Sequence, residues 1–310
     1  MDSPSAPVLD VPALRTLRPP LQQARHDPAH CLAPGLFQSL ARGDRKGRNL
    51  DITYHYNDNI SVRFTGYNPL GAEELRLLQG LLAMAAQSKT AVDLNNPISD
   101  PAKQLVSLIK PEDDALLYTA ATIKTTIHRL MGEVGYKTDG GQTRKDVIES
   151  LTRLAGVAIH AHAAADKRRV SSQLLSFYLD EKTGELRVAL NPRLTQAIIG
   201  GDGNSYTLID MREVRVLRGD VARLLHQRLS AIVQAGRGSK RFKLNTMLSY
   251  VWPGTAEGST LRRRRQLLRQ AFKELEATGG WLIKEEAEGL CVVTRRPIGY
   301  TMALPRPEPV

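Results

Sequence analysis

The sequence of 310 residues predicts an α+β fold in which one order of elements occurs twice. Apolar residues at helical spacing alternate with short β-like segments, and glycines and prolines mark most of the borders between them. The repeated order is helix, strand, helix, helix and hairpin, which is typical of a winged helix-turn-helix domain. We therefore predict two tandem winged helix-turn-helix domains with a small extra N-terminal β-hairpin.

The extra hairpin precedes the first copy. Alternating segments at 50–56 and 60–65 flank the Asn and Asp residues at 57–59, a pattern that favours a turn between two strands. The first copy follows between residues 71 and 179. Its predicted elements are a helix near 71–87, a strand at 115–119, a helix at 123–134, a helix near 143–155, and β-like segments at 157–163 and 170–179.

The second copy repeats this order nearer the C-terminus. Its predicted elements are a helix at 220–233, a strand at 241–244, a short helix at 245–252, a long helix from 259 to about 278, and a hairpin of 281–285 and 290–294. Asn245 is expected to cap the short helix, and Pro253 and Gly254 break the chain after it. Gly279 and Gly280 are expected to end the long helix.

Proline and glycine positions also set the predicted domain limits. Residues 1–24 contain several prolines and no sustained period, so we expect a disordered arm. A run of Gly, Asp and Asn at 200–204 predicts the border between two winged-helix domains. The N-terminal domain is expected to cover 25–200 and the C-terminal domain 201–296, followed by a proline-rich disordered tail at 297–310.

The charge balance favours a polyanionic partner. The chain has 43 Lys and Arg against 32 Asp and Glu, a net charge of +11, which favours nucleic acid or an anionic membrane surface. Aromatic residues make up only 5%, which argues against a base-stacking platform for single strands. No apolar stretch is long enough to span a membrane. We therefore expect a cytoplasmic protein whose partner is double-stranded DNA and not a membrane.

The longest predicted helix of the second copy carries the clearest functional signal. At ~100° per residue its apolar side chains fall on one side, and the opposite side is made of Arg, Gln and Lys with no acid before Glu274. A solvated face normally mixes acids with bases, whereas Arg and Gln can bond guanine and adenine bidentately. The predicted DNA contacts on this helix are Ser259, Thr260, Arg262, Arg263, Arg264, Arg265, Gln266, Arg269, Gln270 and Lys273.

Further basic residues extend this predicted surface. Phosphate contacts are expected from Lys240, Arg241, Lys243, Arg295 and Arg296. The equivalent helix of the first copy has mixed charge. Its first residues are interpreted equally as a DNA contact or as a helix start that is simply exposed to solvent. The residues concerned are Gln142, Thr143, Arg144 and Lys145.

Two patterns in the sequence contain residue types that bind metals. His26, His30 and Cys31 resemble half of a zinc site, but the other half is missing, and the two cysteines of the chain exclude a four-cysteine site. Asp27 and Pro28 more simply open a short helix. We therefore expect no metal at this segment.

The second pattern is the pair His160 and His162 on a predicted strand, where both side chains point to one face. Such a pair can hold Mn²⁺ or Mg²⁺ in a rolling-circle nickase, with Tyr178 or Tyr206 as nucleophile. No acidic ligand neighbours the pair, and neither tyrosine lies in a helical motif near a basic residue. With no carboxylate pair or nucleotide pocket either, we expect a non-enzyme with no catalytic residue, metal or cofactor.

Five long stretches of the sequence resemble the RepC replication initiators of IncQ-type broad-host-range plasmids. They are Arg25–Phe37, Pro69–Gly80, Ala222–Leu229, Tyr250–Pro253 and Gly258–Gln266. The resemblance implies a protein that binds iteron repeats of a plasmid's vegetative origin, helps to open the adjacent DNA, and lets a plasmid-encoded helicase and primase load. It implies DNA contacts at 259–273 and 142–145.

A winged-helix transcriptional regulator is the main alternative. Direct repeats suit a monomer with tandem domains, whereas inverted repeats suit a two-fold dimer. Formation of a homodimer through the first domain is left open.

Overall fold

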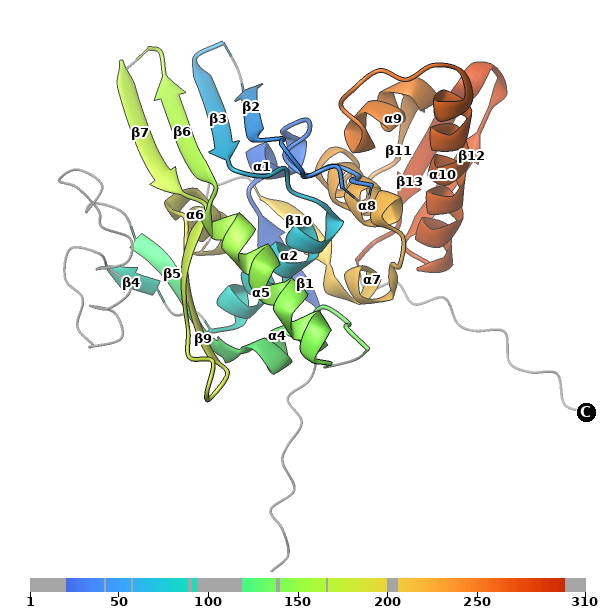
Figure 1. The fold of residues 1–310 in the computed structure, drawn as a ribbon. Coiled ribbons are helices and arrows are strands. Elements are labelled where there is room, and N and C mark those ends of the chain that lie inside the picture. The colour runs from blue at the N-terminus through green and yellow to red at the C-terminus, as the bar shows by residue number, and fades with distance from the viewer. Residues whose placement is uncertain are drawn as a thin grey trace, which may run out of the picture.

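The computed structural model describes residues 21–41, 43–56, 58–88, 91–93, 119–137, 140–165, 167–199 and 206–298. Across these segments, no helix combines the length and apolarity needed to cross a bilayer. Two parts of the molecule project from a central helical body: a four-stranded sheet on one side and the C-terminal helices and hairpin on the other (Figure 1).

The C-terminal part, here called the second unit, contains all the elements predicted for the second copy. They are α8 (Asp220–Ile232), β11 (Ser239–Lys243), α9 (Leu244–Val251), α10 (Gly258–Ala277), β12 (Trp281–Glu285) and β13 (Leu290–Arg295), and a 3₁₀ turn at Ala287–Gly289 joins the last two. The strands pair in the order β11-β13-β12. One detail is wrong: Lys243, not Asn245, is the N-cap residue of α9, because β11 runs directly into the helix.

The first unit repeats this arrangement. It consists of α2 (Ala72–Ser88), β5 (Thr119–Thr126), α4 (Ile127–Glu133), α5 (Gly141–Ala155), β8 (Leu175–Leu179) and β9 (Glu185–Leu190). Its sheet order is β4-β5-β9-β8, with β4 (Ala91–Asp93) at one edge. The order β5-β9-β8 therefore matches β11-β13-β12 of the second unit. Most of the predicted strand at 115–119 lies outside the described residues.

The helix predicted from residue 123 begins later than expected. Residues up to Thr126 continue β5, because a run of β-branched Thr and Ile favours the extended backbone. Thr126 then caps α4, its hydroxyl accepting a hydrogen bond from the Arg129 N–H at 3.1 Å. The change from strand to helix thus occurs at a capping residue.

The predicted extra hairpin is confirmed, and it is part of a larger sheet. Strands β2 (Leu50–His55) and β3 (Ile60–Gly66) pair with β6 (Ala158–Ala163) and β7 (Arg168–Gln173) in one antiparallel sheet of order β2-β3-β6-β7. The prediction that 157–163 and 170–179 close the first unit is therefore wrong. The chain changes sheets at buried Leu174, and the closing hairpin is β8–β9.

Short elements near the centre join the two units. They are β1 (Gln23–His26), α1 (Pro28–Leu32), α6 (Pro192–Ile199), β10 (Thr207–Asp210) and α7 (Met211–Val216). Strand β1 pairs with β10, so a sheet connects residues on either side of the predicted domain border. Residues 200–204, which form that border, lie outside the described residues. The predicted arm is also too long at its C-terminal end, since Leu21 is buried and β1 begins at Gln23.

The short helix predicted at Asp27 and Pro28 is confirmed as α1. Asp27 is its N-cap and accepts hydrogen bonds from the His30 N–H at 3.2 Å and the His30 ring at 2.8 Å. His30 and Cys31, which belong to α1, are buried. Helix α1 packs against α8.

Candidate nucleic-acid interface

Helix α10 lies along the outer side of the second unit (Figure 1). Its apolar residues Leu268, Ala271, Phe272 and Leu275 are buried and pack it against α8 and β12. Glu274 accepts hydrogen bonds from the Gly219 N–H at 3.0 and 3.1 Å, which fixes the helix to the start of α8. The opposite side of α10 is left facing solvent, as its amphipathic spacing predicts.

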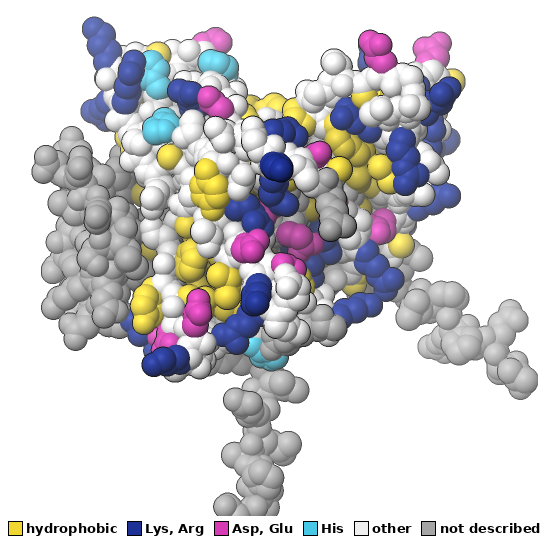
Figure 2. Space-filling view, in the orientation of Figure 1, with side chains coloured by type: hydrophobic (Ala, Val, Ile, Leu, Met, Phe, Trp, Pro, Cys, Tyr) yellow, Lys and Arg dark blue, Asp and Glu magenta, His cyan; other side chains and the backbone are white. Residues whose placement is uncertain are grey.

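Five exposed residues form what we call the open face of α10: Arg262, Arg263, Gln266, Gln270 and Lys273. None of them has an ion pair in the described part of the chain, and the polar contact within the set joins Arg263 to the Gln266 side-chain oxygen at 3.0 Å. Ser259 and Thr260 are exposed at the first turn. This side of the molecule shows a gathering of Lys and Arg side chains (Figure 2). The open face therefore presents hydrogen-bond donors that no internal acid engages.

Three other arginines of α10 are engaged within the protein. Arg264 donates to the Gly254 carbonyl at 2.8 Å and lies 5.4 Å from the Trp252 ring, and Arg265 donates to the Asn245 side chain at 3.2 Å. The contacts of Arg264 hold the loop between α9 and α10 in place, and the contact of Arg265 joins α10 to the first turn of α9. The predicted DNA contacts of these residues thus compete with internal ones.

Arg269 is held by the hairpin. Its guanidinium forms a two-pronged ion pair with Glu285 on β12, with N···O distances of 2.9 and 2.8 Å. Hydrogen bonding from Arg269 lowers the pKa of the Glu285 carboxyl below its usual range. Glu286 and Glu288 lie at the same end of the hairpin, which therefore presents acids beside the basic helix. This pair is not predictable from helical spacing, because its members are sixteen positions apart and lie on different elements.

The predicted phosphate contacts divide into two groups. Lys240, Arg241 and Lys243 on β11 are exposed, while Phe242 between them points into the core. Arg295 was predicted wrongly: it is only 3% exposed. Its guanidinium donates to the carbonyls of Ser230 at 3.2 Å and Leu208 at 2.8 Å.

The position of Arg295 in β13 explains this burial. Side chains alternate along β13, and those of Val293 and Arg295 point inward. The guanidinium of Arg295 therefore lies 5.1 Å from the Trp281 ring, although its position at the end of a strand predicts exposure to solvent. Burial lowers the pKa of Arg295. Arg296 donates to the Gly279 carbonyl at 3.2 Å. The end of β13 is thus built into the protein interior.

In the first unit, the start of α5 is less basic. Gln142 and Lys145 are exposed, and Gln142 donates to Asp146 at 2.8 Å. Thr143 and Arg144 are half-buried, and Arg144 reaches toward Gly184 in the β8–β9 turn. The mixed charge predicted for this helix is present.

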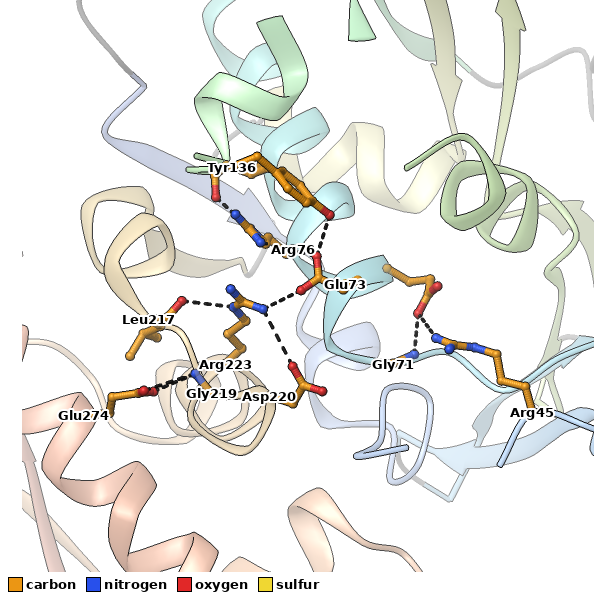
Figure 3. A network of polar contacts seen from close by, with 12 residues as sticks. Arg45, Gly71, Glu73, Arg76, Tyr136, Leu217, Gly219, Asp220, Arg223 and Glu274 are labelled. Atoms are coloured by element: carbon orange, nitrogen blue, oxygen red, sulfur yellow. Dashed lines mark hydrogen bonds and ion pairs between the residues drawn. The ribbon is translucent and has the colours of Figure 1, made fainter. Parts of the chain in front are cut away.

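A polar network ties the two units together through α2 and α8 (Figure 3). Arg223 on α8 donates to Glu73 on α2 at 2.5 Å and to the Leu217 carbonyl at 3.1 Å. Glu73 also accepts from the Tyr136 hydroxyl at 2.5 Å, and burial together with Glu73 raises the pKa of Tyr136. Arg76 donates to the Val134 carbonyl at 2.7 Å. These contacts fix α2 against α8, and α5 packs on α2 while α10 packs on α8.

The histidine pair His160 and His162 lies on β6. His160 contacts two hydroxyls, Ser171 at 3.0 Å and Thr65 at 3.3 Å, and Tyr178 and Tyr206 are exposed. Within the segments that the structure describes, no three His, Cys, Asp or Glu residues group as metal ligands would. The hydrogen-bonding contacts of His160 are thus with hydroxyls.

Three solved structures are similar to this chain. Domains 2 and 3 of RctB match with a TM-score of 0.58 at 11% identity, covering 87% of this chain and 98% of that one. A second RctB structure of the same domains gives 0.49 at 11% identity, covering 84% and 92%. The Pi initiator protein, crystallised with iteron DNA, gives 0.46 at 12% identity, covering 72% and 89%. A search of curated sequences returns no match.

The first of these likenesses defines the class of protein: a mixed α+β chain with the fold of RctB domains 2 and 3. The family is more specific. The chain belongs to the replication protein C (RepC) family, whose model matches residues 18–297. The resemblance seen in the sequence is thereby confirmed at the level of the family, and the protein functions in DNA replication.

Proposed function

We propose that the protein is a plasmid replication initiator that binds iteron repeats in double-stranded DNA through two tandem winged helix-turn-helix domains. The two units with matching sheet order would be these domains, and α5 and α10 their recognition helices. Membership of the RepC family supports the proposal. The observation that carries it is the open face of α10, whose donors have no acid partner among the residues that the structure describes.

In this proposal the open face enters the major groove. Arg262, Arg263 and Gln266 contact base edges, where a good contact contributes ~1–3 kcal/mol to discrimination. Lys240, Arg241 and Lys243 anchor phosphates from β11. If the second unit neutralises about six phosphates, the log–log dependence of affinity on salt has a slope near −5.

The fixed arrangement of the two units raises affinity. The network of Figure 3 holds α2 against α8, and α5 and α10 pack on these two helices. Binding of one helix therefore places the other near the same DNA at high effective concentration. This geometry suits direct repeats, each bound by one chain. Self-association as a homodimer would add further contacts between neighbouring repeats.

Origin opening follows from binding in this scheme. A protein opens DNA only if it prefers the distorted form, and bending of adjacent repeats supplies that preference through deformation energy. The plasmid-encoded helicase and primase then load on the opened strand. The protein acts as a binder and not as an enzyme, with no metal or cofactor.

A nuclease footprint of the full chain on plasmid-origin DNA tests the proposal. We expect protection of direct repeats, and at least a tenfold loss of affinity when Arg262 and Arg263 are both changed to Ala. Arg218→Ala, an exposed arginine in the turn before α8, is the matched control. Protection of inverted repeats would favour a transcriptional regulator. Conversion of supercoiled to nicked DNA that is lost in His160→Ala would show a nickase.

A further inference from the structure

The outer face of the sheet β2-β3-β6-β7 is concave, and the function proposed above does not use it. Its surface encloses about 540 Å³. We call this surface the outer sheet face. Besides Ala161 and Val170, its lining includes the polar residues Thr53, Arg63, His160, His162, Arg169 and Ser171.

Strand register places these residues in two rows across the sheet. Thr53, Arg63, His160 and Ser171 lie side by side in one row, and His162 pairs with Arg169 in the next. The contacts of His160 with Ser171 and Thr65 hold its ring in the surface. The opposite side of the sheet carries Ile52, Phe64 and Ile159, which pack into the core. The outer sheet face is therefore a fixed surface of hydroxyls, imidazoles and guanidinium groups.

The charge of this face is unbalanced at Arg169. Arg63 is neutralised by Asp51 through contacts of 2.8 and 2.7 Å. Arg169 is exposed and has no ion pair with any residue that the structure describes. Lys167 and Arg168 lie beside it at the end of the same hairpin. Lys, Arg and His side chains gather on this projecting end of the sheet (Figure 2).

We propose that the outer sheet face binds the sugar–phosphate backbone of duplex DNA, beside the stretch that α10 contacts. Arg side chains and the hydroxyls of Ser and Thr are usual phosphate ligands in protein–DNA complexes. The described face has no Phe, Tyr or Trp on which an unpaired base would stack, which favours duplex over single-stranded DNA. The inference rests on the proposed function, since it adds a second contact to the same DNA.

The test compares two adjacent arginines on one strand. Side chains alternate along β7, so Arg169 lines the outer sheet face and Arg168 does not. Affinity of the full chain, Arg169→Gln and Arg168→Gln is measured by fluorescence anisotropy at several salt concentrations. The probe is a random-sequence duplex of about 40 base pairs, because phosphate contacts do not depend on sequence. Both arginines are exposed, so both variants are expected to melt at the temperature of the parent protein.

We expect Arg169→Gln to reduce the magnitude of the log–log salt slope by about 0.9, the value of one phosphate contact, and Arg168→Gln to leave it unchanged. Equal slopes for the two variants would overturn the proposal. A reduction seen with a single-stranded oligonucleotide and absent with the duplex would also overturn it. Loss of repeat-specific protection by the Arg262 and Arg263 double variant tests the proposed function separately, so the two failures can be told apart.

Discussion

The ion pair between Arg269 and Glu285 sets a restraint on the basic helix that a single substitution removes. Glu285→Gln keeps the shape of the side chain and abolishes its charge. Arg269 is 51% exposed and Glu285 32%, and exposed pairs of this kind contribute ~0.2–1 kcal/mol to folding. The variant is therefore expected to stay folded, with a free energy of unfolding lowered by less than about 1 kcal/mol.

The effect on DNA binding has the opposite sign. Release of Arg269 adds one guanidinium next to the open face of α10. At the lower end of ~1–3 kcal/mol per specific contact, the gain is about fivefold in Kd, since 1.4 kcal/mol corresponds to tenfold. If the new contact is to a phosphate, the salt slope also becomes steeper by about 0.9.

Anisotropy titrations of the footprinted repeat would measure both quantities. Glu288→Gln is the control, because Glu288 lies on the same hairpin, is exposed and has no ion pair in the described structure. It loses the same negative charge without releasing an arginine. Equal gains in the two variants would refute the reasoning, because the gain would then be general charge repulsion. No gain in Glu285→Gln would show that the pair does not restrain Arg269.

Three further predictions concern buried residues. Burial, with His30 nearby, lowers the pKa of His26 in the folded protein to about 3. In the unfolded chain the His26 ring binds a proton below about pH 6.5. The free energy of unfolding therefore decreases as the pH is lowered from 6.5 to 3. His26→Leu should reduce the slope of unfolding free energy against pH by up to ~1.4 kcal/mol per pH unit, as measured by urea titrations at pH 6 and 4.5. Arg295→Ala should lower the melting temperature and leave the salt slope of DNA binding unchanged; a flatter slope would restore Arg295 as a phosphate contact. Leu268→Ala, at the centre of the buried side of α10, should cost ~2–5 kcal/mol in denaturant unfolding, and a cost below 1 kcal/mol would mean that the helix packs loosely.

The sequence predicts local features of this fold well. Helix α10 follows from the spacing of Leu268, Ala271, Phe272 and Leu275, and the β2–β3 hairpin follows from the turn residues at 57–59. Both depend on residues that are near one another in the chain, so periodicity and turn chemistry are sufficient. The exposed side of α10 could be predicted for the same reason.

Contacts between distant residues could not be predicted in this way. Residues 170–179 appear as one segment, but the chain divides at Leu174 between two sheets whose partner strands lie far away in the sequence. Arg295 next to Arg296 is typical of a solvated basic end, and its burial depends on Trp281, Ser230 and Leu208. Pairing of β1 with β10 joins residues about 180 positions apart, beyond the reach of pattern analysis.

The pairing of β1 with β10 has a consequence for how the polypeptide can be divided. A protease cut within residues 200–205 would break the covalent link between the halves, yet β1 would still hold β10 by backbone hydrogen bonds. The bond between Gln79 and Gln227 and that between Arg223 and Glu73 would persist as well. The nicked chains should therefore elute together from a sizing column, and neither half would be a sound starting point for separate expression.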